Sequence, residues 1–182
     1  MCIRDSNKPY DAKGETASRG KIDAGLLDTL TAHPYFHRSP PRSAWRLDFG
    51  ADYADQRMAE YARLPAEDML ATFTEFTAIA IGRSIRDHIK RLDEIKVMMA
   101  SGGGARNGFL MRRIADHLPK TLRLTLSDEF GVPAPFKEAI KFATLAHATV
   151  NHFANNIPAA SGASRFAILG KIALPPRMAK LT

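Results

Sequence analysis

Residues 96–126 constrain the fold most, because a helix pattern lies there between two strand patterns. The apolar run 96–100 is short enough to be a buried strand, and residues 121–126 alternate apolar and polar side chains with a period of two. Four apolar residues between them recur on one side of a helix: Phe109, Leu110, Ile114 and Leu118. Strands joined by a helical crossover lie side by side and parallel. The sequence therefore predicts an α/β fold with several helices and a short sheet that contains parallel strands.

The segment 65–92 predicts a long helix that backs this sheet. Its stripe of mostly apolar residues steps by three or four positions: Leu70, Phe73, Thr77, Ile81, Ile85, Ile89 and Leu92. Pro65 suits the first helical position, and Lys90 and Arg91 suit the negative carboxyl-terminal end. At about 1.5 Å per residue the helix would span roughly 40 Å, which is long enough to back a whole sheet.

Shorter helices are expected on both sides of this region. The ranges with helical spacing are 21–31, 51–62 and about 136–153, and a last short helix is expected after the tail 155–164. Residues 33–43 are predicted to form a loop because they contain three prolines.

The composition is that of an ordinary globular protein. Of the 182 residues, 45% are hydrophobic and 25% are charged, which argues against wholesale disorder. No stretch of about 18 uninterrupted apolar residues occurs, so neither a transmembrane helix nor a membrane partner is expected. Cys2 is the one cysteine, which excludes an internal disulfide and a four-cysteine zinc site, and a reducing compartment fits.

The positive charge is confined to the second part of the chain. The formal net charge is +7, and residues 1–100 are neutral, so all of it lies in residues 101–182. A basic face attracts nucleic acid, an anionic membrane or a phosphorylated small molecule, or it is simply a solvated surface. Because no cluster of Lys and Arg alternates with aromatic residues, nucleic acid is not an expected partner.

The glycine-rich segment 101–108 (SGGGARNG) joins the first predicted strand to the helix. Glycine allows a ligand to approach the main chain closely, and a helix N-terminus favours phosphate. The segment is neither a Walker A loop nor a dinucleotide fingerprint, since no Gly-Lys-Ser/Thr follows and Asn107 occupies the place of the third glycine. Two interpretations remain: a nucleotide loop, or a structural turn in which Asn107 caps the helix.

Two carboxylates are placed where ligands bind in open α/β sheets, outside the carboxyl ends of the strands. Asp128 follows the second predicted strand, and Glu138 lies near the start of a helix. The alternatives are a turn residue for Asp128 and a helix-start carboxylate for Glu138. His147 and His152 are five residues apart and do not share a helical face, so no metal-ligating residues are expected.

Six segments of the sequence occur in an order that resembles one family, although each segment alone is not specific. The segments are KPYDAKG (8–14), PYF (34–36), PPRS (40–43), ASGGGARN (100–107), KEAIKFATLA (137–146) and NIPAASGAS (156–164). With these segments the sequence is similar to the carboxyl-terminal half of 1,6-anhydro-N-acetylmuramic acid kinase, over about residues 7–175. The family belongs to the superfamily of sugar kinases, heat-shock ATPases and actin.

The resemblance implies part of a ribonuclease-H-like ATPase lobe and a kinase reaction. Such kinases use ATP and Mg²⁺ to phosphorylate the anhydro-sugar while water opens its bridge, which gives N-acetylmuramic acid 6-phosphate in cytoplasmic cell-wall recycling. It also implies a substrate-side segment at 7–64, a nucleotide-binding lobe at 65–182, and a possible homodimer. Residues 1–6 do not resemble the family and are expected to be foreign.

The resemblance also assigns roles to individual residues. The nucleotide's ribose and phosphates are expected at Gly102, Gly103, Gly104 and Asn107, with Arg106 pairing with phosphate or with a neighbouring carboxylate. Asp128 is expected at the edge of the cleft, and Glu138 near the sugar or metal. The family's catalytic aspartate matches no position here, so the chain is expected to be inactive alone. The alternative is a non-enzymatic α/β module that binds a nucleotide or another polyanion.

Overall fold

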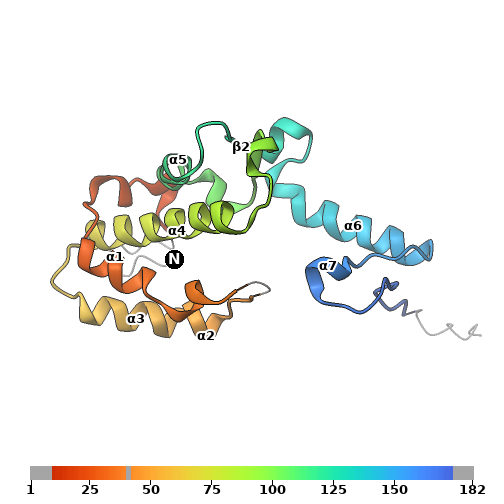
Figure 1. Cartoon of the computed structure of the whole chain (residues 1–182), viewed down its shortest axis with the longest axis horizontal. Coiled ribbons are helices and arrows are strands. Elements are labelled where there is room, and N and C mark those ends of the chain that lie inside the picture. The colour runs from red at the N-terminus through yellow and green to blue at the C-terminus, as the bar shows by residue number, and fades with distance from the viewer. Residues whose placement is uncertain (1–9, 40–41, 174–182) are drawn as a thin grey trace, which may run out of the picture. The chain divides into compact units, whose positions relative to one another are not determined.

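The computed structural model describes residues 10–39 and 42–173, and the chain divides into two compact units between Gly131 and Val132 (Figure 1). The first unit contains the long helix, the sheet and the glycine-rich segment. The second contains the last helices. No helix in these described ranges is both long and apolar enough to cross a membrane.

The long helix is α4 (Ala66–His88), which is packed between α5 and α1 (Figure 1). It begins one residue after the predicted position, because Pro65 has a non-helical ψ of 148° and occupies the N-cap position. It also ends before Lys90 and Arg91, where Arg91 adopts a positive φ of 58°. The buried face is shifted from the predicted stripe, since Thr77 is exposed while Glu75 is buried.

The predicted parallel strands are confirmed. β1 (Val97–Ala100) and β2 (Arg123–Leu126) form a two-stranded parallel sheet, and α5 (Gly108–His117) makes the crossover between them. The hydrophobic core under the sheet joins α4, α5 and the segment before β2. Its buried members are Ala78, Ile114, Leu118 and Leu122, with Met98 and Leu124 packed against them from the strands.

The amino-terminal segment packs against α4 within the same unit. It contains α1 (Ala24–Thr31), α2 (Arg46–Phe49) and α3 (Ala51–Glu60), of which α1 and α3 match predicted helices and α2 does not. The predicted loop 33–43 includes a 3₁₀ turn at Pro34–His37, and its residues 40–41 lie outside the described ranges. This segment and α4 belong to the same compact unit. The expected boundary between a substrate-side segment at 7–64 and a nucleotide-binding lobe at 65–182 is a division of function, and it stays a prediction.

The contact between α1 and α4 is well defined. Leu26 and Leu30 of α1 are fully buried. The side chain of Asp23 caps α1 by accepting a hydrogen bond from the Leu26 N–H at 2.8 Å. The backbone N–H of Asp23 donates to Thr72 Oγ1 on α4 at 2.9 Å, which fixes the start of α1 to the long helix.

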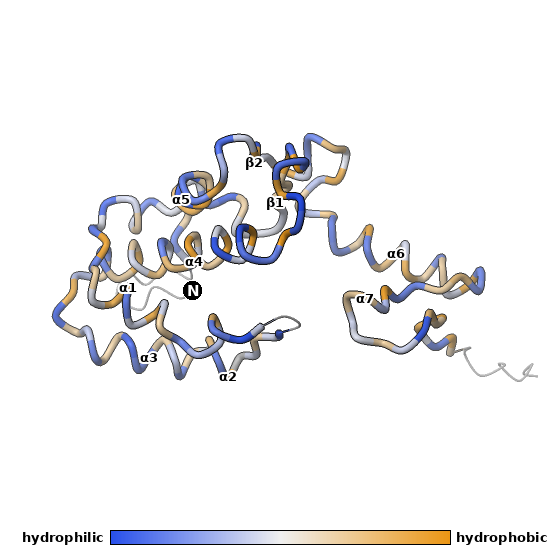
Figure 2. The backbone as a smooth tube through the Cα atoms, viewed as in Figure 1, coloured by the Kyte–Doolittle hydropathy of each residue, from blue (hydrophilic) through white to orange (hydrophobic). Residues whose placement is uncertain are grey.

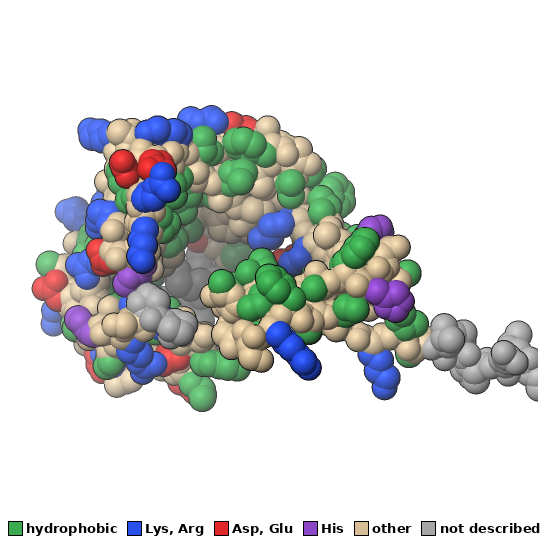
Figure 3. All heavy atoms as spheres, turned by 45° about the vertical axis from the view of Figure 1, so that its right-hand side comes forward, with side chains coloured by type: hydrophobic (Ala, Val, Ile, Leu, Met, Phe, Trp, Pro, Cys, Tyr) green, Lys and Arg blue, Asp and Glu red, His purple; other side chains and the backbone are tan. Residues whose placement is uncertain are grey.

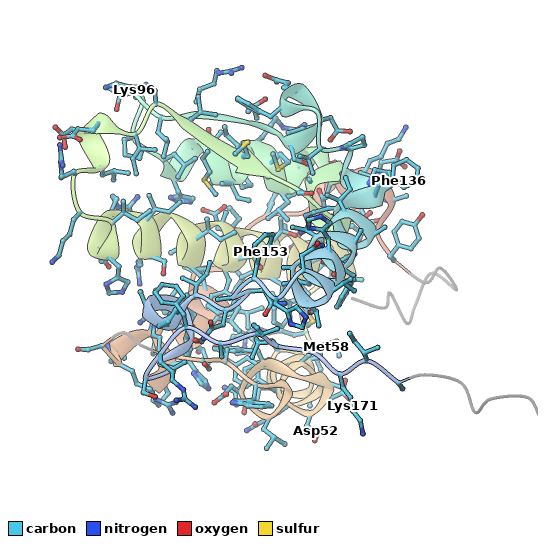
Figure 4. The ribbon with its side chains drawn as sticks, turned by 90° about the vertical axis from the view of Figure 1, so that its right-hand side faces the viewer. Asp52, Met58, Lys96, Phe136, Phe153 and Lys171 are labelled. Carbon is cyan, nitrogen blue, oxygen red and sulfur yellow. The ribbon has the colours of Figure 1, made fainter. Side chains whose placement is uncertain are left out.

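The second unit consists of α6 (Lys137–Val150), α7 (Pro158–Ser161) and an extended tail. The helix predicted over 136–153 is therefore confirmed. The structure has a short helix at α7, within the predicted tail, and no helix over the described residues 165–173, where the last short helix was expected to begin. Apolar residues occur all along α6 (Figure 2), yet none of its residues is buried. Hydrophobic side chains lie at the surface of this unit (Figure 3), including Phe136 and Phe153 at the two ends of α6 (Figure 4).

Candidate functional site

The candidate site lies at the carboxyl edge of the sheet. Ala100 ends β1 and Leu126 ends β2, and these two residues are register partners. The loops that follow them, 101–107 and 127–131, therefore leave the sheet from the same edge. Ligands of open α/β sheets bind outside this edge.

Gly102, Gly103 and Gly104 form a bend in the glycine-rich loop. The backbone conformation of Gly102 requires glycine, and the space beside the bend is not filled by other residues. Gly102 has φ +93° and ψ −173°, a region that side chains rarely adopt. A 3₁₀ turn at Gly103–Arg106 follows it. A Cβ atom added at Gly102 or Gly103 would meet no atom within 4 Å, and at Gly104 the nearest atom is Leu110 Cδ2 at 3.6 Å. Because the absence of these side chains leaves space rather than a packed contact, the loop can admit a ligand.

Asn107 caps α5, as the structural interpretation of the loop predicts. Its Oδ1 accepts a hydrogen bond from the Leu110 N–H at 2.9 Å. The cap and the open bend occur together, so the two interpretations of the loop do not exclude each other. The α5 helix has ten residues, and its N-terminus carries a partial positive charge toward the bend.

The loop is held in place by the amino-terminal segment. Gly14 is buried with φ +76°, and a Cβ atom there would lie 2.8 Å from Phe109 Cβ and closer still to Asn107 Oδ1. Next to it, buried Ala17 packs in a small cluster with Leu70 and Phe109. Two segments that are about 90 residues apart in the sequence thus meet at the base of the bend, which no local pattern in the sequence indicated.

Asp128 and Arg106 are placed on the two loops as predicted. Asp128 lies in the 3₁₀ turn Ser127–Phe130 directly after β2, and Arg106 ends the turn of the glycine loop. Both side chains are exposed, and within the described part of the chain neither has an ion pair or a side-chain hydrogen bond. The pairing of Arg106 with a neighbouring carboxylate is therefore not formed, and both groups are available to solvent or to a ligand.

Glu129, which was not a predicted site residue, is tied to β2. It accepts hydrogen bonds from the Thr125 hydroxyl and from Arg123 Nη1, the latter at 2.9 Å. These two hydrogen bonds, from Thr125 first, hold the pKa of Glu129 below its usual value. Glu129 therefore stays ionised beside Asp128 and stabilises the turn.

Two serines that sequence analysis did not single out lie at the same edge. Ser101 follows Ala100, and Ser127 follows Leu126, so the two serines occupy matching positions at the ends of the paired strands. The Oγ atom of each is buried without a hydrogen-bond partner in the described residues. A buried hydroxyl without a partner costs about 1–3 kcal/mol. A water or ligand group bound at this edge would remove that cost.

A buried ion pair, also missed from the sequence, fixes α5 against α4. Glu75 on α4 is 4% exposed and accepts hydrogen bonds from Arg113 Nε at 2.5 Å and Nη2 at 2.9 Å. His117 Nε2 lies 2.7 Å from the same carboxylate. Burial raises the pKa of Glu75, but the hydrogen bonds from Arg113 and His117 outweigh burial and leave the pKa below its usual value. The glycine loop is thus attached to a helix whose position is fixed by charge as well as by packing.

Glu138 belongs to the second unit, where it lies in the first turn of α6. It is exposed and forms an ion pair with Lys141 Nζ at 2.5 Å. The hydrogen bond from Lys141 and its charge hold the pKa of Glu138 below its usual value. A hollow of about 400 Å³ in this unit is lined mainly by apolar residues from α6 and the tail, and Glu138 is not among its lining residues.

The described residues do not form a metal site by themselves. In residues 10–39 and 42–173 no three His, Cys, Asp or Glu side chains are grouped so that they could hold a metal ion. A magnesium ion at the carboxyl edge would therefore need oxygen ligands from elsewhere, such as nucleotide phosphates and water.

Comparisons with known proteins agree with the resemblance. The sequence profile of the anhydro-N-acetylmuramic acid kinase family matches residues 1–175. This match includes residues 1–6, whose foreign origin stays a prediction.

Among the relatives with that name, the protein of Ralstonia nicotianae is 43% identical over 164 residues, which cover 90% of this chain and 42% of the relative. The protein of Francisella tularensis is 39% identical over 166 residues, which cover 91% of this chain and 43% of the relative. That of Clostridioides difficile is 36% identical over 176 residues, or 97% and 46%. The chain thus spans less than half the length of these relatives, and it belongs to the anhydro-N-acetylmuramic acid kinase family.

Proposed function

We propose that this chain is the carboxyl-terminal, nucleotide-binding lobe of an ATP-dependent anhydro-N-acetylmuramic acid kinase, with a partial ribonuclease-H-like fold. The observation that carries the proposal is the open glycine bend at the carboxyl edge of two parallel strands. The reaction is phosphorylation of 1,6-anhydro-N-acetylmuramic acid to N-acetylmuramic acid 6-phosphate in cell-wall recycling. A cytoplasmic location and a homodimer are part of the same proposal.

The glycine loop binds the nucleotide through its main chain. Gly102 and Gly103 leave the space that phosphate oxygens need to reach backbone N–H groups, and Gly104 continues the same turn. Asn107 positions the N-terminus of α5 behind the loop and contributes to the ribose and phosphate contacts. The exposed Arg106 adds a positive charge, which favours a polyanion.

Two carboxylates complete the assignment. Asp128, exposed and without an ion pair in the described residues, lies where it can accept hydrogen bonds from the nucleotide or from water around Mg²⁺. Glu138 contributes to the sugar side, where Lys141 keeps it ionised. ATP supplies the phosphoryl group, and Mg²⁺ neutralises negative charge on the phosphates.

This chain alone is expected not to turn over the substrate. The resemblance assigns the general base to an aspartate that matches no residue in this sequence. Binding of nucleotide can therefore be measured without interference from the reaction.

The test compares MgATP binding by the full chain and by two glycine variants. Gly103→Val places methyl groups in open space at the bend, so stability is retained while phosphate approach is obstructed. The matched control is Gly108→Ala in α5, where a Cβ atom has only ordinary contacts, at 3.7 Å to Arg112 and 3.9 Å to Lys13.

Equilibrium dialysis is expected to show binding that weakens about tenfold or more in Gly103→Val and is unchanged in Gly108→Ala. Equal binding by Gly103→Val and wild type would refute the loop assignment. Salt-dependent binding of DNA or RNA, with no effect of nucleotide on melting, would favour the alternative of a non-enzymatic polyanion-binding module.

A further inference from the structure

The contacts between α4 and α5 follow the same order along both helices. Near the start of each helix, Phe109 of α5 packs on a buried cluster that contains Leu70 of α4. Further along, Arg113 of α5 meets Glu75 of α4. The two helices therefore run in the same direction, with the glycine bend at the beginning of α5. A shift of α5 along α4 would move that end of the bend by the same distance.

One polar cluster crosses this interface with contacts that depend on angle as well as on distance. The two carboxylate oxygens of Glu75 accept hydrogen bonds from Arg113 Nε at 2.5 Å and Nη2 at 2.9 Å. His117 Nε2 lies 2.7 Å from the same carboxylate and donates to it, because an ionised carboxylate accepts hydrogen bonds and donates none. Two parallel bonds between a planar guanidinium and a carboxylate fix the relative orientation of the groups.

His117 also holds α5 at a second point on α4. A Cβ atom added at Gly82 of α4 would lie 2.7 Å from His117 Cβ and 2.8 Å from the His117 carbonyl oxygen. Arg86 Nη1 of α4 donates to this carbonyl at 2.5 Å. The backbone of α5 thus comes very close to α4 at the residue whose side chain reaches Glu75.

The apolar core between the helices supplies stability but little directional information. Its buried members include Ala78 on α4 and Ile114 on α5. Hydrophobic burial is non-directional, so such a core tolerates small shifts of one helix along the other. A buried ion pair has the opposite properties: desolvation removes most of its contribution to stability, and fixing a register is its best-attested use. The cluster around Glu75 is therefore better suited to setting position than to adding stability.

We propose that Glu75, Arg113 and His117 are positioning residues that fix the register of α5 on α4 and thereby hold the glycine bend in the form that accepts a nucleotide. The bend is joined to β1 at one end and to α5 at the other, so its shape depends on where α5 lies. Arg113 follows Asn107 by six residues, or about 9 Å of helix, so the cluster acts through α5. The effect on binding rests on the proposed function, whereas the effect on register can be measured without nucleotide.

Replacement of the whole cluster by apolar residues separates position from stability. The triple variant combines Glu75→Leu, Arg113→Met and His117→Leu, and it keeps the formal net charge because one carboxylate and one guanidinium are removed together. Its melting temperature is expected to equal or exceed that of wild type, because apolar residues replace a buried ion pair without desolvation. Ile114→Val is the matched control: it loosens the same interface and lowers the melting temperature, but it keeps every hydrogen bond of the cluster.

Two measurements follow each variant, and circular dichroism checks that its helices are retained. In amide NMR spectra without nucleotide, the signals of Gly102, Gly103 and Gly104 are expected to shift in the triple variant and to stay in place in Ile114→Val. In equilibrium dialysis, MgATP binding is expected to weaken about tenfold or more in the triple variant and by less than about twofold in Ile114→Val.

Single variants provide the rescue test and cover a triple variant that loses its helices. His117→Gln keeps an N–H donor for Glu75 and is expected to bind MgATP as wild type does, whereas His117→Leu binds more weakly. Arg113→Lys keeps the charge but not the paired geometry of the guanidinium, so it is expected to shift the glycine signals and to weaken binding.

Unchanged glycine signals in a folded triple variant, or in Arg113→Lys, would overturn the proposed control of register. Shifted signals with unchanged MgATP affinity would overturn the effect on the nucleotide site. If wild type itself does not bind MgATP, the proposed function is refuted, and the glycine signals alone then decide whether the cluster sets the register of α5.

Discussion

Removal of Arg113 tests whether the buried ion pair holds α5 against α4. In Arg113→Ala, the Glu75 carboxylate keeps its buried position but loses both guanidinium hydrogen bonds, at 2.5 and 2.9 Å. His117 is then the one remaining partner of this carboxylate among the described residues. The variant therefore leaves a buried charge that is only partly compensated.

The magnitude follows from the exposure of the two partners. Breaking a buried pair by removing one partner costs about 3–5 kcal/mol. We expect the lower end, about 3 kcal/mol of unfolding free energy, because the Arg113 side chain is 29% exposed. Glu75→Gln is expected to cost less, about 1–2 kcal/mol, since it leaves a cation that water can reach. For a chain of this size, 3 kcal/mol corresponds to a fall in Tm of roughly 10 °C.

The assay is urea unfolding of the full chain, followed by circular dichroism. Arg112→Ala is the matched control: Arg112 is the neighbouring exposed arginine on α5, with its guanidinium 5.8 Å from the Phe109 ring, and its removal is expected to cost less than about 0.5 kcal/mol. A cost below about 1 kcal/mol for Arg113→Ala, or a larger cost for Glu75→Gln, would refute the reasoning.

Two further predictions concern protonation and the unpartnered serines. Because the pKa of Glu75 in the folded chain is below its ordinary value of 4.5, the unfolded chain takes up the proton first. The stability that Glu75 contributes is thus present above about pH 4.5 and is lost as the pH falls through the pKa of Glu75 in the folded chain. Over this fall in pH, the midpoint of urea unfolding is expected to decrease less in Glu75→Gln than in wild type. Equal decreases in the two proteins would contradict the assignment of this pH dependence to Glu75. Ser127→Ala removes a buried hydroxyl that has no partner in the described residues, so the variant is expected to be as stable as wild type or up to about 1 kcal/mol more stable by thermal unfolding. A loss of more than about 1 kcal/mol would show that the hydroxyl has a partner.

Local patterns in the sequence predicted most of the elements. The alternation in 121–126 and the apolar run in 96–100 gave the two strands, and helical spacing gave α4, α5 and α6. In the first unit these patterns succeed because one face of each element is buried, which imposes its period on the sequence. The α6 helix has the same helical spacing, although none of its residues is buried. The ends of the elements were predicted less accurately. The α4 helix stops at His88 and does not reach residue 92, because Arg91 adopts a left-handed conformation through which a helix cannot continue.

Long-range contacts were not predictable from such patterns. Glu75 is a charged residue in the middle of a helix, and its burial depends on Arg113 and His117, which are 38 and 42 residues away. Gly14 gave no local signal either, because its need to be glycine arises from Asn107 and Phe109. The glycine bend itself was located from the sequence, but only the structure shows that it is open.

The most direct test of the central claim is an amide NMR titration of the full chain with MgATP. The account predicts that the backbone signals of Gly102, Gly103 and Gly104 shift most, with Asp128 among the next affected, because phosphate approaches the bend at the carboxyl edge of the sheet. Signals of these three glycines that stay fixed while signals elsewhere in the chain shift would contradict the account.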